Sequence, residues 1–84
     1  MTGTNRFVYI LRSRREDGRL YIGVTDDVAG RIAAHNSGHY PQTASHRPGA
    51  LHVAMAFADE PTAVRFERFL KSRSGRAFAS RYFI

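Results

Sequence analysis

Five side chains that can take part in chemistry lie in stretches otherwise patterned like a buried core: Tyr9, Tyr21, Arg31, His35 and Glu67. On a helical wheel, Arg31 and His35 share one face, one turn apart, beside apolar neighbours. Glu67 borders the apolar face of its predicted helix, where a carboxylate is costly unless it is paired or bound to a cation. Taken singly, each of the three also has an ordinary explanation: a snorkelling arginine, a half-buried histidine, or a carboxylate whose head reaches water.

The two tyrosines lie in neighbouring predicted strands. The dipeptide Asp17-Gly18 between these strands is a hairpin signal, so we expect the strands to pair antiparallel. One register places Tyr9 and Tyr21 on the same face, where their phenols project together. A slip by one residue separates them. Tyrosine is also a frequent strand residue, so plain packing is the alternative.

The elements that must position these groups follow from hydrophobic spacing and cap residues. The predicted strands are Phe7–Leu11, buried on both faces, Leu20–Val24 and Leu51–Phe57, and the predicted helices are Asp27–Asn36 and Pro61–Ser72. We expect a loop over Ser37–Gly49, a break at Ser74-Gly75, and a short third helix that buries Phe78 and Tyr82. The order β-β-α-β-α-α predicts an α+β fold with a three-stranded, mostly antiparallel sheet flanked by helices.

Length and composition narrow the class of protein. The 84 residues predict a single domain, with residues 1–5 as a flexible tail. All but one of the 13 basic residues are arginine, and the net charge of +6 favours a polyanionic partner such as nucleic acid, although a solvated basic surface would look the same. The chain has no cysteine, and its longest apolar run, Val53–Ala58, is too short to span a membrane. We therefore expect a cytoplasmic protein without disulfides.

The ordered set of motifs resembles the GIY-YIG nuclease superfamily. More narrowly, it is similar to the small stand-alone bacterial members that are related to the nuclease domain of excinuclease. The first motif is Phe7-Val8-Tyr9 and the second is Tyr21-Ile22-Gly23. Arg31 stands ten residues after the second tyrosine, His35 follows one turn later, and Glu67 lies in the segment RFERFLKS.

This resemblance implies a metal-dependent endonuclease that hydrolyses phosphodiester bonds in DNA, in repair or processing. Glu67 would hold one divalent cation, Mg²⁺ or Mn²⁺, through oxygen. Arg31 would grip a phosphate, Tyr9 would deprotonate or orient the attacking water, and Tyr21 would position the phosphate or the water. His35 would assist proton transfer.

The resemblance departs from the superfamily pattern in two places. Phe7 replaces the glycine of the first motif, and no asparagine follows Asn36, although several active superfamily nucleases carry one after the glutamate helix. The alternatives are therefore a catalytically weak or inactive nucleic-acid-binding module of the same fold, or a protein–protein adaptor. Besides Arg31, we expect His39, His46 and Arg47 to contact nucleic acid, with specificity supplied by this loop, by a homodimer or by a partner protein.

Overall fold

The computed structural model describes residues 6–15, 18–44 and 47–83, apart from the side chains of residues 42 and 43. The elements in chain order are β1 (Arg6–Ser13), β2 (Leu20–Thr25), α1 (Val28–Asn36), α2 (Pro41–Ala44), β3 (Gly49–Phe57), α3 (Glu60–Lys71) and α4 (Arg73–Tyr82). The strands form one antiparallel sheet in the order β2-β1-β3, which confirms the predicted fold. The prediction of a loop throughout Ser37–Gly49 is wrong at one point, because this segment contains the single-turn helix α2.

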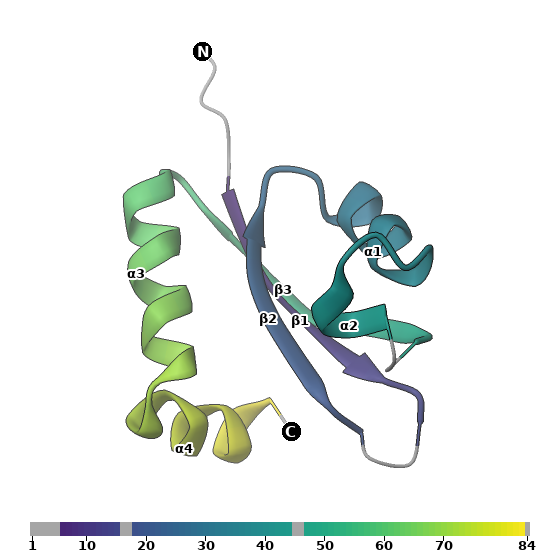
Figure 1. Cartoon of the computed structure of the whole chain (residues 1–84). Helices are drawn as coiled ribbons and strands as arrows, with labels where there is room; N and C mark the ends of the chain where they lie inside the picture. Colours follow the sequence, from purple (N-terminus) through teal and green to yellow (C-terminus); the bar gives the residue numbers. More distant parts are fainter. Residues whose placement is uncertain (1–5, 16–17, 45–46, 84) are drawn as a thin grey trace.

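The sheet separates two layers of helices (Figure 1). Helices α3 and α4 cover one face and α1 and α2 lie against the other. β1 is the central strand, and its residues from Val8 to Leu11 are all buried, as expected for a strand covered on both faces. Successive residues of β1 therefore point into different layers.

The hydrophobic core lies on the α3–α4 side of the sheet. Val8 and Ile10 from β1 pack there with Ala63 and Leu70 from α3 and Ala79 from α4. Phenylalanines from β3, α3, α4 and the residue that follows α4 extend this cluster through ring contacts at centroid distances of 5.5 to 6.2 Å: Phe57, Phe66, Phe69, Phe78 and Phe83. This layer supplies most of the apolar burial that holds the sheet in place.

Aspartates cap the starts of two of the helices. The Asp27 carboxylate accepts a hydrogen bond from the Gly30 amide at the start of α1, and the Asp59 carboxylate accepts one from the Thr62 amide at the start of α3. Gly38 follows α1 with φ +85°, a left-handed conformation that suits glycine. The cap at Asp27 matters for function because α1 carries both Arg31 and His35.

The C-terminal helices differ from the prediction in two respects. The break falls at Ser72, which ends α3 and caps α4, whereas Gly75 lies inside the first turn of α4. Gly75 is buried, and a β-carbon there would collide with the Phe69 carbonyl group, so the two helices can approach this closely only at a glycine. Tyr82 is 65% exposed, so the prediction that it is buried is wrong.

Candidate active site

The hairpin register, which the sequence left open, places both motif tyrosines on the α1–α2 face of the sheet. Tyr9 pairs with Gly23, and Leu11 pairs with Tyr21. Tyr9 and Tyr21 are therefore diagonal neighbours on one face, and their ring centroids lie 6.2 Å apart. Of the two registers that the sequence left open, the structure has the one in which the two phenols share a face.

Gly23 is the residue that lets the Tyr9 ring lie flat across the neighbouring strand. A β-carbon at Gly23 would stand 2.5 Å from the Tyr9 hydroxyl oxygen and 2.7 Å from its Cζ. Any larger residue would push the phenol out of place. The glycine of the second motif thus has a direct physical role, which is to make room for the tyrosine of the first.

Helix α1 brings Arg31 and His35 onto the Tyr9 hydroxyl. The hydroxyl oxygen lies 3.1 Å from His35 Nε2, and Arg31 Nη1 donates to the same oxygen at 3.5 Å. Tyr9 and His35 are almost completely buried, at 0% and 1% exposed, while Tyr21 and Arg31 are partly exposed. The three groups form a hydrogen-bonded series that runs from a partly exposed cation to a buried imidazole.

Tyr40 completes this cluster, although it is not among the residues expected from the sequence. Its ring lies 4.5 Å from the His35 ring, and the Arg31 guanidinium carbon stands 5.4 Å from its centroid. Tyr21 packs on His35 at 4.7 Å. The cation and the imidazole are therefore held by aromatic rings from β2 and from the segment between α1 and α2. Tyr40 lies in the connection after α1, where the sequence has no periodic pattern. The one hint in the sequence is that Tyr40 directly follows another aromatic residue, His39.

Burial shifts the pKa values of the central pair in opposite directions. Burial raises the pKa of Tyr9 to about 12, against the opposing effect of the Arg31 hydrogen bond. Burial, together with the nearby Arg31 charge, lowers the pKa of His35 below its usual value of 6.5. At neutral pH both groups are uncharged, and Arg31 carries the positive charge of the cluster.

Glu67 lies on α3, the helix that covers the opposite face of the sheet. Its side chain is only 15% exposed, as expected for a residue that borders the core face, and it forms an ion pair with Lys71. The Tyr9 hydroxyl has hydrogen-bond partners on α1, namely Arg31 and His35, whereas the ion-pair partner of Glu67 is Lys71 on its own helix. The structure thus assembles four of the five predicted catalytic residues, and the fifth lies on α3, a helix that packs against β2 as well as β1.

A model of the GIY-YIG catalytic domain matches residues 5–82. The chain belongs to the GIY-YIG family. A UPF0213 protein of Streptococcus pneumoniae serotype 4 is 38% identical over 68 residues, which cover 80% of this chain and 67% of that protein. The UPF0213 protein ORF82 of Orgyia pseudotsugata multicapsid polyhedrosis virus is 34% identical over 76 residues, or 88% and 71% of the two chains. The solution NMR structure of a Bacillus halodurans UPF0213 protein superposes with a TM-score of 0.56 at 35% identity, covering 94% of this chain and 86% of that one.

The two GIY-YIG motifs thus correspond to paired segments of β1 and β2, and the helix that follows them supplies the arginine and the histidine. Outside this cluster, the residues expected to contact nucleic acid lie near the α1–β3 connection. His39 is exposed and packs edge-on against Tyr40 at 4.8 Å. The exposed Arg47 donates from Nε to the Ala44 carbonyl, and its guanidinium lies close to Gly38.

Several predictions for this GIY-YIG chain fall where the structure makes no statement. His46, Asp17 of the hairpin signal and the tail at residues 1–5 lie outside the described residues. Within the described residues, no helix is long and apolar enough to cross a membrane. The same part of the chain contains no cluster of three or more acidic, histidine or cysteine side chains suited to a metal ion.

Proposed function

We propose that the chain is a metal-dependent endonuclease that hydrolyses phosphodiester bonds in DNA, in repair or processing. The hydrogen-bonded series from Arg31 through Tyr9 to His35 carries this proposal. Plain packing does not require a cation, a phenol and an imidazole to meet at one oxygen beneath two aromatic rings. Hydrolysis of a phosphate ester does require a positive charge for the phosphate and a path for the proton of the attacking water.

The series suggests that Tyr9 relays a proton and does not act as the final base. With a pKa of about 12, its phenolate would be populated in only about one molecule in 10⁵ at pH 7. Arg31 can only donate to the phenol oxygen, so we assign the phenol proton to the neutral His35 Nε2. Tyr9 can then accept a proton from water while it passes its own to His35, without forming a free phenolate.

Arg31 and Tyr21 are the members of the cluster that a substrate can reach, because both are partly exposed. A phosphate oxygen bound to Arg31 would lie beside the Tyr9 hydroxyl, since both groups share one hydrogen bond. Tyr21, on the same face, can orient the phosphate or the water through its own hydroxyl. Arg31 thus has two tasks: it binds the phosphate and opposes the negative charge that develops during attack.

The metal requirement rests on Glu67. Its carboxylate offers the oxygen donor that a hard cation prefers, and Mg²⁺ is commonly held by one or two carboxylates together with substrate phosphates. A bound metal would stabilise charge on the scissile phosphate and on the leaving oxygen. Because Lys71 pairs with Glu67, metal binding must compete with this ion pair, so we expect weak binding until nucleic acid is present.

One observation favours the alternative of a catalytically weak or inactive DNA- or RNA-binding module. Tyr9 and His35 are closed to solvent, so water reaches the phenol only if the covering side chains move. The partly exposed side chains that contact this pair include Tyr21, Tyr40 and Arg31. A module without catalysis would keep Arg31 and the other arginines for phosphate and use its tyrosines for stacking.

The two functions are separated by a cleavage assay. Labelled single-stranded, duplex and branched DNA is incubated with Mg²⁺ or Mn²⁺ and the wild-type chain, Arg31→Ala or Glu67→Ala. Arg68→Ala, which changes an exposed arginine on α3, is the matched control. We expect cleavage by the wild type and the control, and a loss of at least about 100-fold in the two site variants. Cleavage that survives both substitutions would refute the site. Salt-sensitive binding without cleavage under either metal would establish the binding module.

A further inference from the structure

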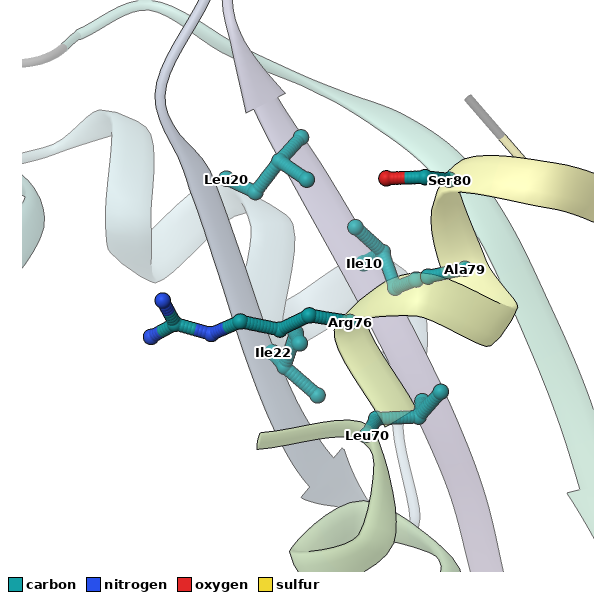
Figure 2. A pocket seen from close by; sticks show the side chains of 7 residues that line it. All are labelled: Ile10, Leu20, Ile22, Leu70, Arg76, Ala79 and Ser80. Atoms are coloured by element: carbon teal, nitrogen blue, oxygen red, sulfur yellow. The ribbon is translucent and has the colours of Figure 1, made fainter. Parts of the chain in front are cut away.

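A pocket lies on the face of β2 that carries Leu20 and Ile22, which is opposite to the face that carries Tyr21. Figure 2 shows the side chains that line it. Its volume is about 320 Å³, near the lower end of the range for pockets that hold small ligands. The lining that solvent can reach consists of the partly exposed Leu20 and Ile22 of β2 and the exposed Arg76 and Ser80 of α4. The remaining lining residues, Ile10, Leu70 and Ala79, belong to the buried core. We call this site the α4 pocket.

The α4 pocket combines an apolar interior with a cation at its margin. Figure 2 shows the Arg76 side chain extended beside Ile22, with its guanidinium pointing away from Ala79 and Ser80. Arg76 and Ser80 are both exposed. In the described part of the chain, no ion pair joins Arg76 to an acidic side chain, and α4 contains no acidic residue. The pocket therefore suits a ligand with an apolar body and an anionic group.

The α4 pocket and the tyrosine cluster lie on opposite faces of the same strand, β2. Leu20 and Ile22 line the pocket, while Tyr21 between them points into the cluster, because successive strand residues alternate between faces. β2 is an edge strand, so no further strand separates the two sites on that side. A chain-like ligand held at Tyr21 can pass around this edge and reach the pocket.

We propose that the α4 pocket binds one unstacked nucleotide of a single-stranded segment in the DNA substrate, with the base among the aliphatic side chains and a phosphate on Arg76. The inference rests on the proposed function, which supplies nucleic acid at the Tyr21 face. Ser80 can form a hydrogen bond with the edge of the base.

The geometry selects a single strand over a continuous duplex. Duplex DNA has a persistence length of about 50 nm, so it does not turn around the edge of one β-strand. Placing a base in the pocket also requires the base to leave its stack, which is unfavourable in a duplex and least unfavourable in a strand that is already single. The cleaved substrate is therefore expected to be single-stranded or to carry a single-stranded branch.

The first test measures binding without cleavage. Anisotropy of labelled single-stranded DNA and of the matching duplex is recorded in EDTA for the wild type, Arg76→Gln and Ser80→Phe, with Arg68→Gln as the control for loss of one exposed charge. We expect Arg76→Gln to weaken single-strand binding about tenfold and to reduce the slope of log K against log salt by about 0.7, the value for one phosphate contact. Ser80→Phe should weaken it by a similar factor with an unchanged slope, because it fills the pocket mouth.

The control should change single-strand affinity by less than about twofold. Equal losses in Arg76→Gln and Arg68→Gln, or the same loss on duplex as on single strand, would overturn the proposal. Melting temperatures of all variants are compared with wild type to show that each one folds.

The second test needs no variant. Methyl resonances of Ile10, Leu20, Ile22 and Leu70 in the wild-type chain are followed during titration with single-stranded DNA and, separately, with inorganic phosphate. Shifts with DNA but not with phosphate support the proposal, whereas unchanged methyl resonances at saturation with DNA overturn it. The titration is run in EDTA, without metal, so it reports binding in the pocket even if the chain never cleaves DNA. A chain that cleaves without methyl shifts would refute the pocket alone.

Discussion

Tyr9 and Ile10 are successive residues of β1, both completely buried, and they point into different layers of the molecule. Ile10 lies in the aliphatic core with Val8 and Leu70. Tyr9 lies among hydrogen-bonding and aromatic groups, with its hydroxyl on His35 and Arg31. One strand thus contributes a buried side chain to the hydrophobic core on one face and another to the candidate active site on the other face. The groups packed against each face decide which role a residue has.

The two faces also differ in the free energy of burying their side chains. Moving Ile10 out of water is favourable in itself, in proportion to its apolar area. Burying the hydroxyl of Tyr9 is unfavourable unless it is hydrogen-bonded, so the Tyr9 face holds together only while its polar groups meet. We therefore expect changes to the aliphatic packing on the Ile10 face mainly to lower stability, and changes to the hydrogen-bonded groups on the Tyr9 face mainly to lower activity.

The largest expected difference comes from two conservative substitutions at these neighbouring positions. Tyr9→Phe removes one hydroxyl and should lower the rate of DNA cleavage by about 10²- to 10⁴-fold, because the proton path is lost. Ile10→Val shortens a side chain in the lining of the α4 pocket and should leave the single-turnover rate of the folded protein at saturating DNA within about twofold. Both should lower the free energy of unfolding by about 0.5–1.5 kcal/mol. Denaturant titration and single-turnover cleavage measure the two quantities. Equal effects on cleavage would mean that Tyr9 is only a packing residue.

The second prediction concerns the core face alone. Leu70 is completely buried between α3 and the sheet, so Leu70→Ala should lower the free energy of unfolding by about 2–5 kcal/mol. We expect urea denaturation to show this loss, with the single-turnover rate per folded molecule unchanged at saturating DNA, because Leu70 lines the α4 pocket and has no contact with the Tyr9 hydroxyl. A variant that stays folded but no longer cleaves would show that the two faces are coupled.

The sequence predicts the fold and the cluster to different extents, and particular residues show why. Alternation and caps correctly place the strands and the helices α1 and α3, because each depends on neighbours along the chain. Leu51 is 43% exposed although the alternation groups it with Val53, because a register shift between Ile10 and Leu11 turns it toward the other face. Such a shift depends on the partner strand, and the pattern of one strand cannot reveal it.

The candidate site shows the same limit. Spacing along one helix predicts that Arg31 and His35 share a face, and the motif order adds Tyr9 and Tyr21. Tyr40 could not be predicted, because its position depends on how the segment after α1 folds back over the helix. The relation of Glu67 to the cluster depends on the packing of α3 across the sheet, which is also non-local.

Substitutions at two glycines provide a third test of the different roles of the two faces. A β-carbon at Gly23 would meet the Tyr9 hydroxyl at 2.5 Å, whereas one at Gly75 would collide with the backbone of Phe69. Gly23→Ala should displace the phenol and reduce cleavage about tenfold, with a smaller loss of stability. Gly75→Ala must shift two helices, so it should cost about 1–3 kcal/mol of unfolding free energy and spare the rate of the folded fraction. Thermal melting and single-turnover cleavage of both variants test this, and the reverse pattern would contradict it.

The smallest expected effect is a pH dependence that arises on the Tyr9 face. The pKa of His35 is lowered in the folded chain by burial and by Arg31, so the unfolded state binds a proton more readily. Stability should therefore be fully present above pH 6.5 and decrease as the pH falls below that value. Tyr9, with a pKa of about 12, does not titrate in this range. Urea denaturation at pH 8 and pH 5.5 should show a larger loss for wild type than for His35→Gln, while Ile10→Val should keep the wild-type pH dependence. If His35→Gln loses as much stability as wild type, the pH dependence arises from another group. If His35→Gln loses less stability than wild type, the buried imidazole is the group on the Tyr9 face that makes stability depend on pH. The Ile10 face then contributes no pH dependence in this range.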